Sequence, residues 1–185
     1  EYESSSWGLG KAVAYYFIKR QGIYALLGVG ALLLGRSIDY HRYKKHVYLI
    51  LFLCLLGLLL VFVPFIGAKV RGAARWIRLG PFTVQPSEFA KIGIALFLAY
   101  SLSQKQEKMK YFAIGFLPHM LVAGVFIALI GREPDFGTAI TLGAIVFVML
   151  FVGGTRVTQL LLALAGAVPL GAYMVMKDPK KWARF

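Results

Sequence analysis

A short charged segment between two apolar runs contains the first residues that could do chemistry. GREPDFGTA, residues 131–139, includes Arg132, Glu133 and Asp135. A carboxylate can act as a general base, but it can also cap a helix by accepting hydrogen bonds from backbone N–H groups. Pro134 disfavours a helical conformation at the residue before it, so the segment predicts a tight turn between two helices. The residues alone favour this capping and turn role over a catalytic one.

A second charged segment, KVRGAARWIRLGPFTVQPSEFAK at 69–91, is rich in arginine. Arginines could clamp a phosphate group, because a guanidinium donates two parallel hydrogen bonds to phosphate oxygens. The alternative is an interfacial anchor, since Trp76 and basic residues are both common at the level of lipid headgroups. The arginines of the predicted clamp are Arg71, Arg75 and Arg78.

The end of this second segment is typical of a helix start. Pro86 suits the first turn, where its missing N–H has no cost, and Glu88 suits the positive end of the helix dipole. Lys91 follows Glu88 by three residues, so the two side chains share a helix face. Charges inside a membrane span usually face a bundle interior or a water-filled cavity. The pair therefore either locks two helices together or lines a functional cavity.

The elements around these segments are predicted to be membrane helices. Hydrophobic residues make up 59% of the chain, against about 45–50% in ordinary soluble domains. A helix needs about 20 apolar residues to span a bilayer. The charge-free runs near that length are Val47–Ala68, Tyr111–Gly131, Phe136–Gly154 and Val157–Met176, and the shorter candidate spans are Gly22–Gly35 and Phe89–Leu102. We expect an all-α polytopic bundle of about six transmembrane helices, forming one membrane domain over residues 1–185.

The two charged segments are predicted to lie on the same side of the membrane, because two spans separate them. Glu133 and Asp135 could therefore face Arg71, Arg75 or Lys91. The net charge of +13 is compatible with nucleic-acid binding in general. Here the basic residues lie between spans, which favours anionic lipid or an anionic substrate. Loops on the side of the charged segments carry twelve Lys and Arg residues against eight on the other side, which by itself would make the first side cytoplasmic.

Cysteine and histidine usage argues against a structural metal or disulfide framework. Cys54 is alone in the sequence, and His41, His46 and His119 are scattered. A structural zinc site needs several such ligands at short spacings. We therefore expect neither disulfides nor a zinc site.

Several motifs together resemble the FtsW/RodA (SEDS) family. They are SSSWGLG with YYFIKRQ within 4–21, GAARW at 72–76, LGPFTVQPSEFAK at 79–91, EPDFGTA at 133–139 and MLFVGG at 149–154. Each motif alone is weak, but their order and intervals follow the family through nearly the whole chain. GFLPHMLVAGVF at 115–126 is closer to the FtsW-like branch than to the RodA-like branch.

The resemblance implies a bacterial inner-membrane protein with about ten helices, of which this chain would be a fragment. Family members polymerise lipid II into peptidoglycan glycan strands, at the septum or in the lateral wall. The implied partners are lipid II, a class B penicillin-binding transpeptidase and other divisome or elongasome membrane proteins, and no nucleic acid. The family orientation places loop 69–86, turn 131–138 and the start of a large loop at 177–185 outside the cytoplasm, against the charge count.

The resemblance also implies a set of site residues. Those expected to line the substrate cavity are Arg75, Trp76, Gln85, Glu88, Lys91, Glu133 and Asp135, and those expected to contact pyrophosphate are Arg71, Arg75 and Arg78. The catalytic Asp is expected downstream of Phe185. The sequence shows no cofactor site, and a divalent cation is the one cofactor that the resemblance allows. The alternative functions are a lipid II flippase or transporter and a non-catalytic scaffold of the divisome.

Overall fold

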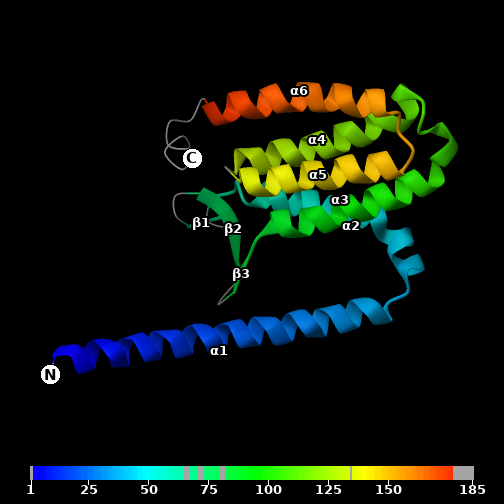
Figure 1. The fold of residues 1–185 in the computed structure, drawn as a ribbon. Helices are drawn as coiled ribbons and strands as arrows, with labels where there is room; N and C mark the ends of the chain where they lie inside the picture. Colours follow the sequence, from blue (N-terminus) through cyan, green and yellow to red (C-terminus); the bar gives the residue numbers. More distant parts are fainter. Residues whose placement is uncertain (1, 65–66, 71–72, 80–81, 134, 177–185) are drawn as a thin grey trace. The chain divides into compact units, whose positions relative to one another are not determined.

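The computed structural model describes residues 2–64, 67–70, 73–79, 82–133 and 135–176 of the 185-residue chain (Figure 1). Its contacts divide the chain into two compact units, residues 1–45 and 46–185. The expected start of a large loop at 177–185 lies outside the described residues.

The first unit is dominated by one long helix, α1 (Tyr2–Ser37). It contains the predicted span Gly22–Gly35, and its stretch Phe17–Ser37 is long and apolar enough to cross a membrane. Helix α2 (Tyr40–Leu60) begins just after it. Asp39 caps this second helix, because its Oδ1 accepts the backbone N–H of His41 at 3.1 Å.

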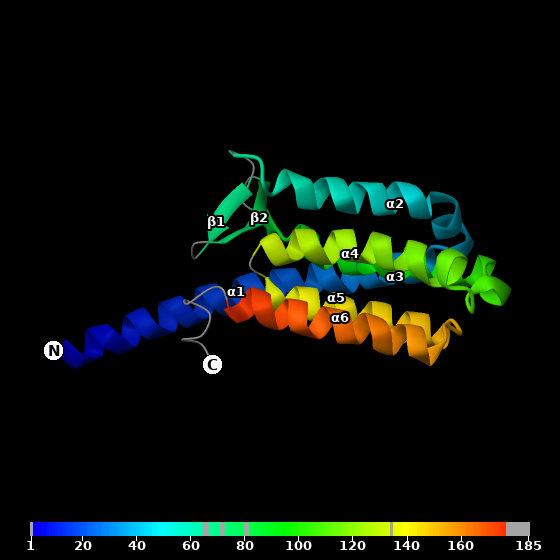
Figure 2. The same ribbon diagram turned by 90° about the horizontal axis from the view of Figure 1, so that it is seen from above.

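The second unit is a bundle of helices that run alongside one another (Figures 1 and 2). Its members are residues 46–60 of α2, α3 (Pro86–Gln104), α4 (Leu117–Arg132), α5 (Phe136–Val152) and α6 (Val157–Met176). A short 3₁₀ turn (Gln106–Lys108) and a π-helical turn (Phe112–Phe116) connect α3 to α4. Each of the six predicted spans overlaps a helix, which confirms the predicted all-α polytopic class.

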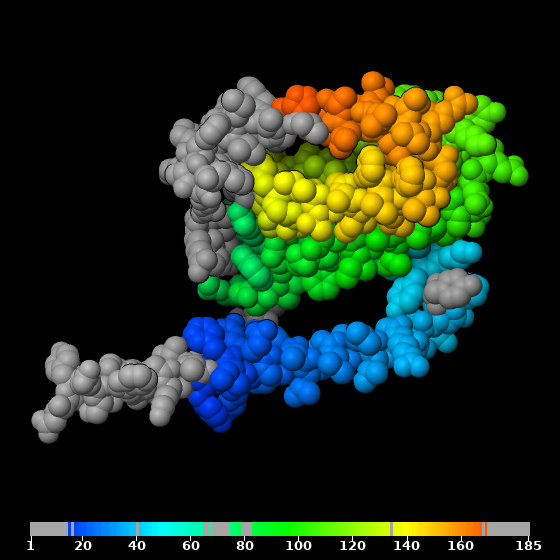
Figure 3. All heavy atoms as spheres, viewed as in Figure 1, coloured from blue at the N-terminus to red at the C-terminus, as the bar shows by residue number. Residues whose placement is uncertain are grey.

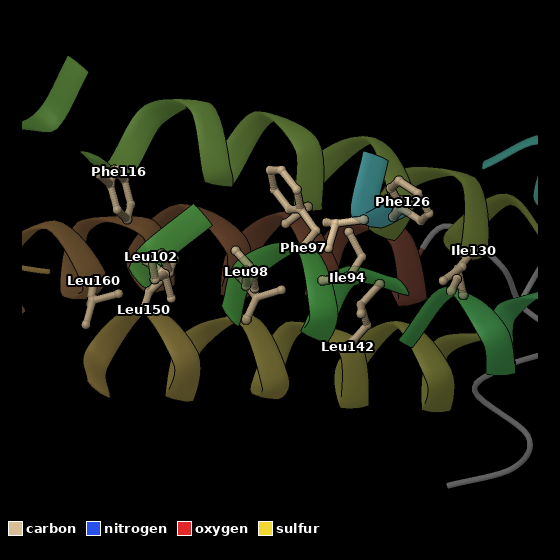
Figure 4. Close-up of a cluster of buried hydrophobic side chains, with 14 of the residues drawn as sticks. Ile94, Phe97, Leu98, Leu102, Phe116, Phe126, Ile130, Leu142, Leu150 and Leu160 are labelled. Carbon is tan, nitrogen blue, oxygen red and sulfur yellow. The ribbon is translucent and has the colours of Figure 1, made fainter. Parts of the chain in front are cut away.

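The core of this unit lies between α3, α4 and α5, which contact one another. Leu98 of α3, Ile130 of α4 and Leu142 of α5 are all fully buried. The labelled side chains of Figure 4 show this core running along the bundle, with Leu160 of α6 packed at one end. The outward faces are also apolar, as lipid contact requires. On α5 and α6, Ile140 and Leu162 are 72% and 68% exposed.

The surface between α5 and α6 is hollowed, with α4 at the floor of the hollow (Figure 3). Helices α5 and α6 contact each other, as do α4 and α5. Exposed apolar side chains occur on both α5 and α6, including Val148 and Leu161.

Helix α2 ends earlier than the sequence predicts. The run Val47–Ala68 was expected to be one span, but the helix stops at Leu60. The amides of Phe62 and Val63 form short-range turn bonds instead, and Pro64 has no N–H with which to continue a helix. Gly67 then passes so close to Val61 that a Cβ would lie 2.2 Å from the Val61 carbonyl oxygen. Only glycine fits at that position without displacing the backbone.

The loop expected at 69–86 contains a three-stranded antiparallel sheet that the sequence reading missed. Its strands are β1 (Gly67–Val70), β2 (Ala73–Leu79) and β3 (Phe82–Val84), in the order β1-β2-β3. The sheet lies at the end of the bundle where α3 and α5 begin and α4 ends (Figure 1). Strand β2 contacts α3, so the sheet is docked on the bundle.

The described helices support a membrane protein. Three stretches are long and apolar enough to cross a bilayer, namely Phe17–Ser37, His41–Leu60 and Phe112–Arg132. Shorter apolar helical stretches are Phe136–Val152 and Val157–Ala167. The predicted single membrane domain and the sidedness of its loops stay predictions.

Candidate functional site

Arg75 is positioned by an irregularity in the sheet. Ala68 pairs with Trp76 and Lys69 with Ala74, so Arg75 is an extra residue on β2 that faces no partner on β1. Such a β-bulge commonly re-aims a side chain next to a functional site. The Arg75 Nε donates a 2.9 Å hydrogen bond to the main-chain oxygen of Glu133, at the end of α4. A cation suits this position because the C-terminal end of a helix carries partial negative charge.

Asp135 is the N-cap of α5, and its side chain has several partners at the site. Its Oδ1 accepts the backbone N–H of Thr138 at 3.3 Å, and its Oδ2 accepts the Thr138 hydroxyl at 2.9 Å. Gln85, just before α3, donates from Nε2 to Asp135 Oδ2 at 2.8 Å. The Arg75 Nη1 lies 3.9 Å from Asp135 Oδ1, an ion pair looser than a hydrogen bond. The capping role that the residues alone favoured for Asp135 is confirmed.

Glu133 is the least satisfied polar group of the site. Its residue is 1% exposed, and both carboxylate oxygens are buried without a hydrogen-bond partner among the described residues. Burial, reinforced by the negative charge of Asp135, raises the pKa of Glu133 to about 7, although Arg75 acts in the opposite direction. Near neutral pH this carboxyl is therefore poised between its neutral and charged forms.

The other predicted site residues lie apart from this junction. Glu88 and Lys91 pair with each other at 2.9 Å, and the side chain of Glu88 is 54% exposed. Lys91 makes no described ion pair with Glu133 or Asp135, and the described ion pair of Asp135 is with Arg75. Trp76 is half-buried on β2, and Arg78 is exposed opposite Thr83 of β3. Arg71 lies outside the described residues.

Two hydroxyl residues at the site were missed by the sequence reading. Thr138 supports Asp135 through both its backbone and its side chain, and Ser87 accepts a 2.9 Å hydrogen bond from Gln85 Nε2. The role of Thr138 could have been predicted from the sequence, because the side chain of an N-cap residue accepts a hydrogen bond from the backbone N–H two or three residues ahead. No sequence pattern pointed to Ser87, because its hydrogen bond depends on the direction in which the Gln85 side chain turns towards Asp135.

The arrangement brings together one guanidinium, two carboxyl groups and an amide at the end of the bundle near the sheet. Such a set can bind an anionic group through Arg75 and hold hydroxyl or amide groups through the carboxylates. Within the described residues no group of three or more His, Cys, Asp or Glu side chains could hold a metal ion.

The sequence comparisons identify relatives along most of the chain. A family profile described as "Cell cycle protein", covering FtsW, RodA and SpoVE, matches residues 4–185. A probable peptidoglycan glycosyltransferase FtsW of Geobacter metallireducens is 44% identical over 162 residues, which is 88% of this chain and 43% of the relative. Stage V sporulation protein E of Bacillus subtilis is 34% identical over 161 residues, 85% of this chain and 44% of the relative. The chain thus spans less than half the length of these relatives.

Solved structures share the fold. One, described as the structural coordination of polymerization and crosslinking by a peptidoglycan synthase complex, matches with a TM-score of 0.69 at 30% identity, over 85% of this chain and 47% of the matched chain. The rod shape determining protein RodA of Thermus thermophilus matches with a TM-score of 0.61 at 30% identity, over 78% of this chain and 47% of that one. The chain therefore belongs to the FtsW, RodA and SpoVE family, among its FtsW-like members.

Proposed function

We propose that the full-length protein containing this chain is a peptidoglycan glycosyltransferase that polymerises lipid II in the bacterial inner membrane. One observation carries the proposal beyond resemblance. The three motifs GAARW, QPSEFAK and EPDFGTA converge on a single carboxylate, because Arg75 and Gln85 both reach Asp135. Residues far apart in the sequence thus form one polar junction at the end of an apolar helical bundle. Polar groups at such a position in a membrane bundle usually serve a substrate or ion.

In the proposed reaction, a sugar hydroxyl of lipid II attacks the anomeric carbon of the lipid-linked growing strand. The new glycosidic bond forms as the bond to undecaprenyl pyrophosphate breaks. A carboxylate accepts the hydroxyl proton, and we place that general base downstream of Phe185. Cationic groups stabilise the charge that develops on the leaving pyrophosphate.

We assign Arg75 to that electrostatic role and Asp135 to positioning. Arg75 is half-buried at the junction, where a partly dehydrated guanidinium binds phosphate oxygens more strongly than it would in water. Asp135 is already engaged by Thr138 and Gln85, so it holds the starts of α3 and α5 rather than taking up a proton. Arg78 and Arg71 remain proposed contacts of the pyrophosphate, and Trp76, Glu88 and Lys91 remain proposed cavity residues.

The orientation and partner follow from the same proposal. The sheet end of the bundle, with β2 and the turn at 131–138, would face outside the cytoplasm, where lipid II is consumed. The matched peptidoglycan synthase complex couples polymerization to crosslinking. We therefore propose a class B penicillin-binding transpeptidase as partner, with other divisome or elongasome membrane proteins around it.

Lipid II binding and turnover by the full-length protein, purified with its transpeptidase, test the proposal. The wild type should bind lipid II and convert it into glycan strands with release of undecaprenyl pyrophosphate. Arg75→Gln should weaken lipid II binding, and unchanged affinity would remove the role assigned to Arg75. Movement of lipid II across a bilayer without any glycan product would indicate a transporter. Neither binding nor product would indicate a scaffold.

A further inference from the structure

A second charged surface, which the proposed reaction does not use, lies at the end of the bundle away from the sheet. Two connections meet there, residues 105–116 between α3 and α4 and residues 153–156 between α5 and α6 (Figure 1). They contain one acid, Glu107, and four basic residues, which leaves a net charge of +3. The basic residues are Lys105, Lys108, Lys110 and Arg156. Such a surface attracts an anionic partner.

The connection between α3 and α4 is packed firmly against the bundle. Met109 is fully buried within it. Gly115 lies so close to the preceding turn that a Cβ there would be 2.6 Å from the main-chain oxygen of Lys108. The side chains of Lys108 and Lys110, on either side of Met109, are exposed. These two lysines therefore extend into solvent from a backbone that is held in place by buried contacts.

The turn between α5 and α6 brings Arg156 to the same place. A Cβ at Gly153 would lie 3.0 Å from Cδ1 of Leu102, so this turn packs on the end of α3. Gln159, in the first turn of α6, donates from Nε2 to the main-chain oxygen of Lys110 at 3.4 Å. Its own backbone N–H bonds the main-chain oxygen of Arg156 at 2.9 Å. Arg156 and Lys110 therefore belong to one continuous surface.

The exposed cations of this surface have no carboxylate to neutralise them within the described part of the chain. The ion pairs formed by the described residues lie elsewhere, so Lys108, Lys110 and Arg156 take part in none of them. Glu107 is exposed as well and is one acid against several bases. The surface is therefore available to an anion that comes from outside the chain.

Exposed apolar side chains adjoin these cations and identify the class of anion. Val157 and Leu161, which follow Arg156 one helical turn apart on α6, are both exposed. Tyr111 and Phe112, which follow Lys110, are exposed too. Basic groups at the end, aromatic rings beside them and aliphatic side chains along the helix are the order found where a bilayer meets water. This order favours a lipid over an acidic soluble protein, which would require only the charges.

We propose that Lys108, Lys110 and Arg156 form a headgroup site for an anionic phospholipid, whose acyl chains lie along Val157 and Leu161 of α6. Basic pockets between membrane helices bind anionic headgroups in this way. The guanidinium of Arg156 can donate two hydrogen bonds to the phosphate, and the lysines add compact positive charges. The site is separate from the junction around Asp135 and does not depend on the proposed reaction.

Native mass spectrometry of the full-length protein in a neutral detergent tests the site, because it resolves each bound lipid. The two probes are dioleoyl phosphatidylglycerol and dioleoyl phosphatidylcholine, which have the same acyl chains and differ in net charge. The wild type should bind phosphatidylglycerol at least about tenfold more tightly than phosphatidylcholine. Glycerol phosphate, which has the anionic group without the chains, should not displace the bound lipid.

Neutralising the three cations should abolish this preference. The site variant combines Lys108→Gln, Lys110→Gln and Arg156→Gln. The matched control combines Arg42→Gln, Lys44→Gln and Lys45→Gln, which removes the same charge from three exposed residues in the first turns of α2. The control should keep the wild-type preference, and so should the charge-conserving combination of Lys108→Arg, Lys110→Arg and Arg156→Lys. Size-exclusion elution identifies any variant that has not folded, and Arg156→Gln alone then replaces the site variant, with a smaller loss in the same direction.

Several results would overturn the proposal. Equal affinity of the wild type for the two lipids would remove the anionic site. Equal losses in the site variant and the matched control would show attraction to the total charge rather than to this surface. Displacement of the lipid by glycerol phosphate would indicate a site for a soluble phosphate. Absence of a preference for phosphatidylglycerol, together with binding of polyglutamate that the site variant loses, would indicate an acidic protein partner.

Discussion

Gln85 donates from Nε2 to Asp135 Oδ2 at 2.8 Å, and this bond joins the residue just before α3 to the residue just before α5. The same nitrogen donates to Ser87 Oγ at 2.9 Å, which fixes the direction of the amide. Asp135 in turn caps α5 through Thr138. The bond therefore sets how the starts of two helices lie at the end of the bundle near the sheet.

Removing either partner of this hydrogen bond should lower the free energy of unfolding. Removing both partners should lower it by less than the sum of the two single losses. Gln85→Ala and Asp135→Ala each delete the same hydrogen bond, which is charge-assisted and worth about 1.5–3 kcal/mol. Asp135→Ala also loses the helix cap, at about 1 kcal/mol. Thermal unfolding of the two single variants and the double variant in detergent measures the coupling. Strictly additive losses would show that the bond contributes nothing.

Replacing Glu133 should stabilise the protein in a pH-dependent way. The pKa of Glu133 rises from an ordinary 4.5 to about 7 on folding, so the folded state binds the proton more tightly than the unfolded state. Stability is therefore highest below the unfolded pKa, falls as the pH rises between the two values, and then levels off. Above the folded-state pKa, the full loss in the free energy of unfolding is about 3 kcal/mol, at about 1.4 kcal/mol per pKa unit.

Glu133→Gln removes this penalty. The difference between the unfolding temperature of Glu133→Gln and that of the wild type should therefore grow in favour of the variant as the pH rises. Measurements at about pH 5 and about pH 8.5 bracket the titration. Glu107→Gln provides the control, because Glu107 is exposed. A difference between Glu133→Gln and wild type that is equal at both pH values would contradict the raised pKa.

The sequence predicted some parts of this site and missed others, for physical reasons. Pro86 correctly marked the start of α3, and counting spans correctly brought the Arg75 segment to the same end as Asp135. The bulge at Arg75 depends on pairing with β1, a tertiary contact that no local pattern encodes. The burial of Glu133 depends likewise on packing. The pairing of Lys91 with Glu88, predicted from their spacing of three residues, is confirmed.

The early end of α2 has a similar explanation. An apolar run from 47 to 68 looks like one span when hydropathy alone is read. Pro64 and the close passage of Gly67 past Val61 turn its last residues towards β1 instead. The proline and glycine therefore predicted the end of this helix better than the apolar composition of the run did.

The close contact between α2 and α3 should make Gly93 sensitive to substitution. A Cβ at Gly93 would lie 2.7 Å from Cys54 Sγ, which is closer than real atoms approach. Gly93→Ala should therefore destabilise the protein by about 1–3 kcal/mol through overpacking. Cys54→Ala in the same chain should restore much of the loss by removing the sulfur. No recovery in the double variant would mean that the backbone, and not Cys54, limits the approach.

A buried histidine at the other end of the bundle should depend on one serine. His119 donates from Nδ1 to the main-chain oxygen of Gly115, so its Nε2 accepts the hydroxyl of Ser101 at 2.8 Å. Ser101→Ala leaves a buried nitrogen without a donor and should cost about 1–3 kcal/mol. Ser103→Ala is the matched control on the same helix, because Ser103 is exposed. Equal losses of thermal stability in the two variants would contradict the role of Ser101.

The central claim is that the junction around Asp135 belongs to a lipid II polymerase. Glycan-strand formation by the full-length protein with its transpeptidase, in wild type, Asp135→Asn and Asp39→Asn, tests it most directly. Asp39 is a matched control, since it also precedes a helix but is exposed beside His41. We expect product from wild type and Asp39→Asn, and a loss of at least about tenfold in Asp135→Asn, corresponding to about 1.4 kcal/mol. Full activity of a folded Asp135→Asn variant, or no product from the wild type, would contradict it.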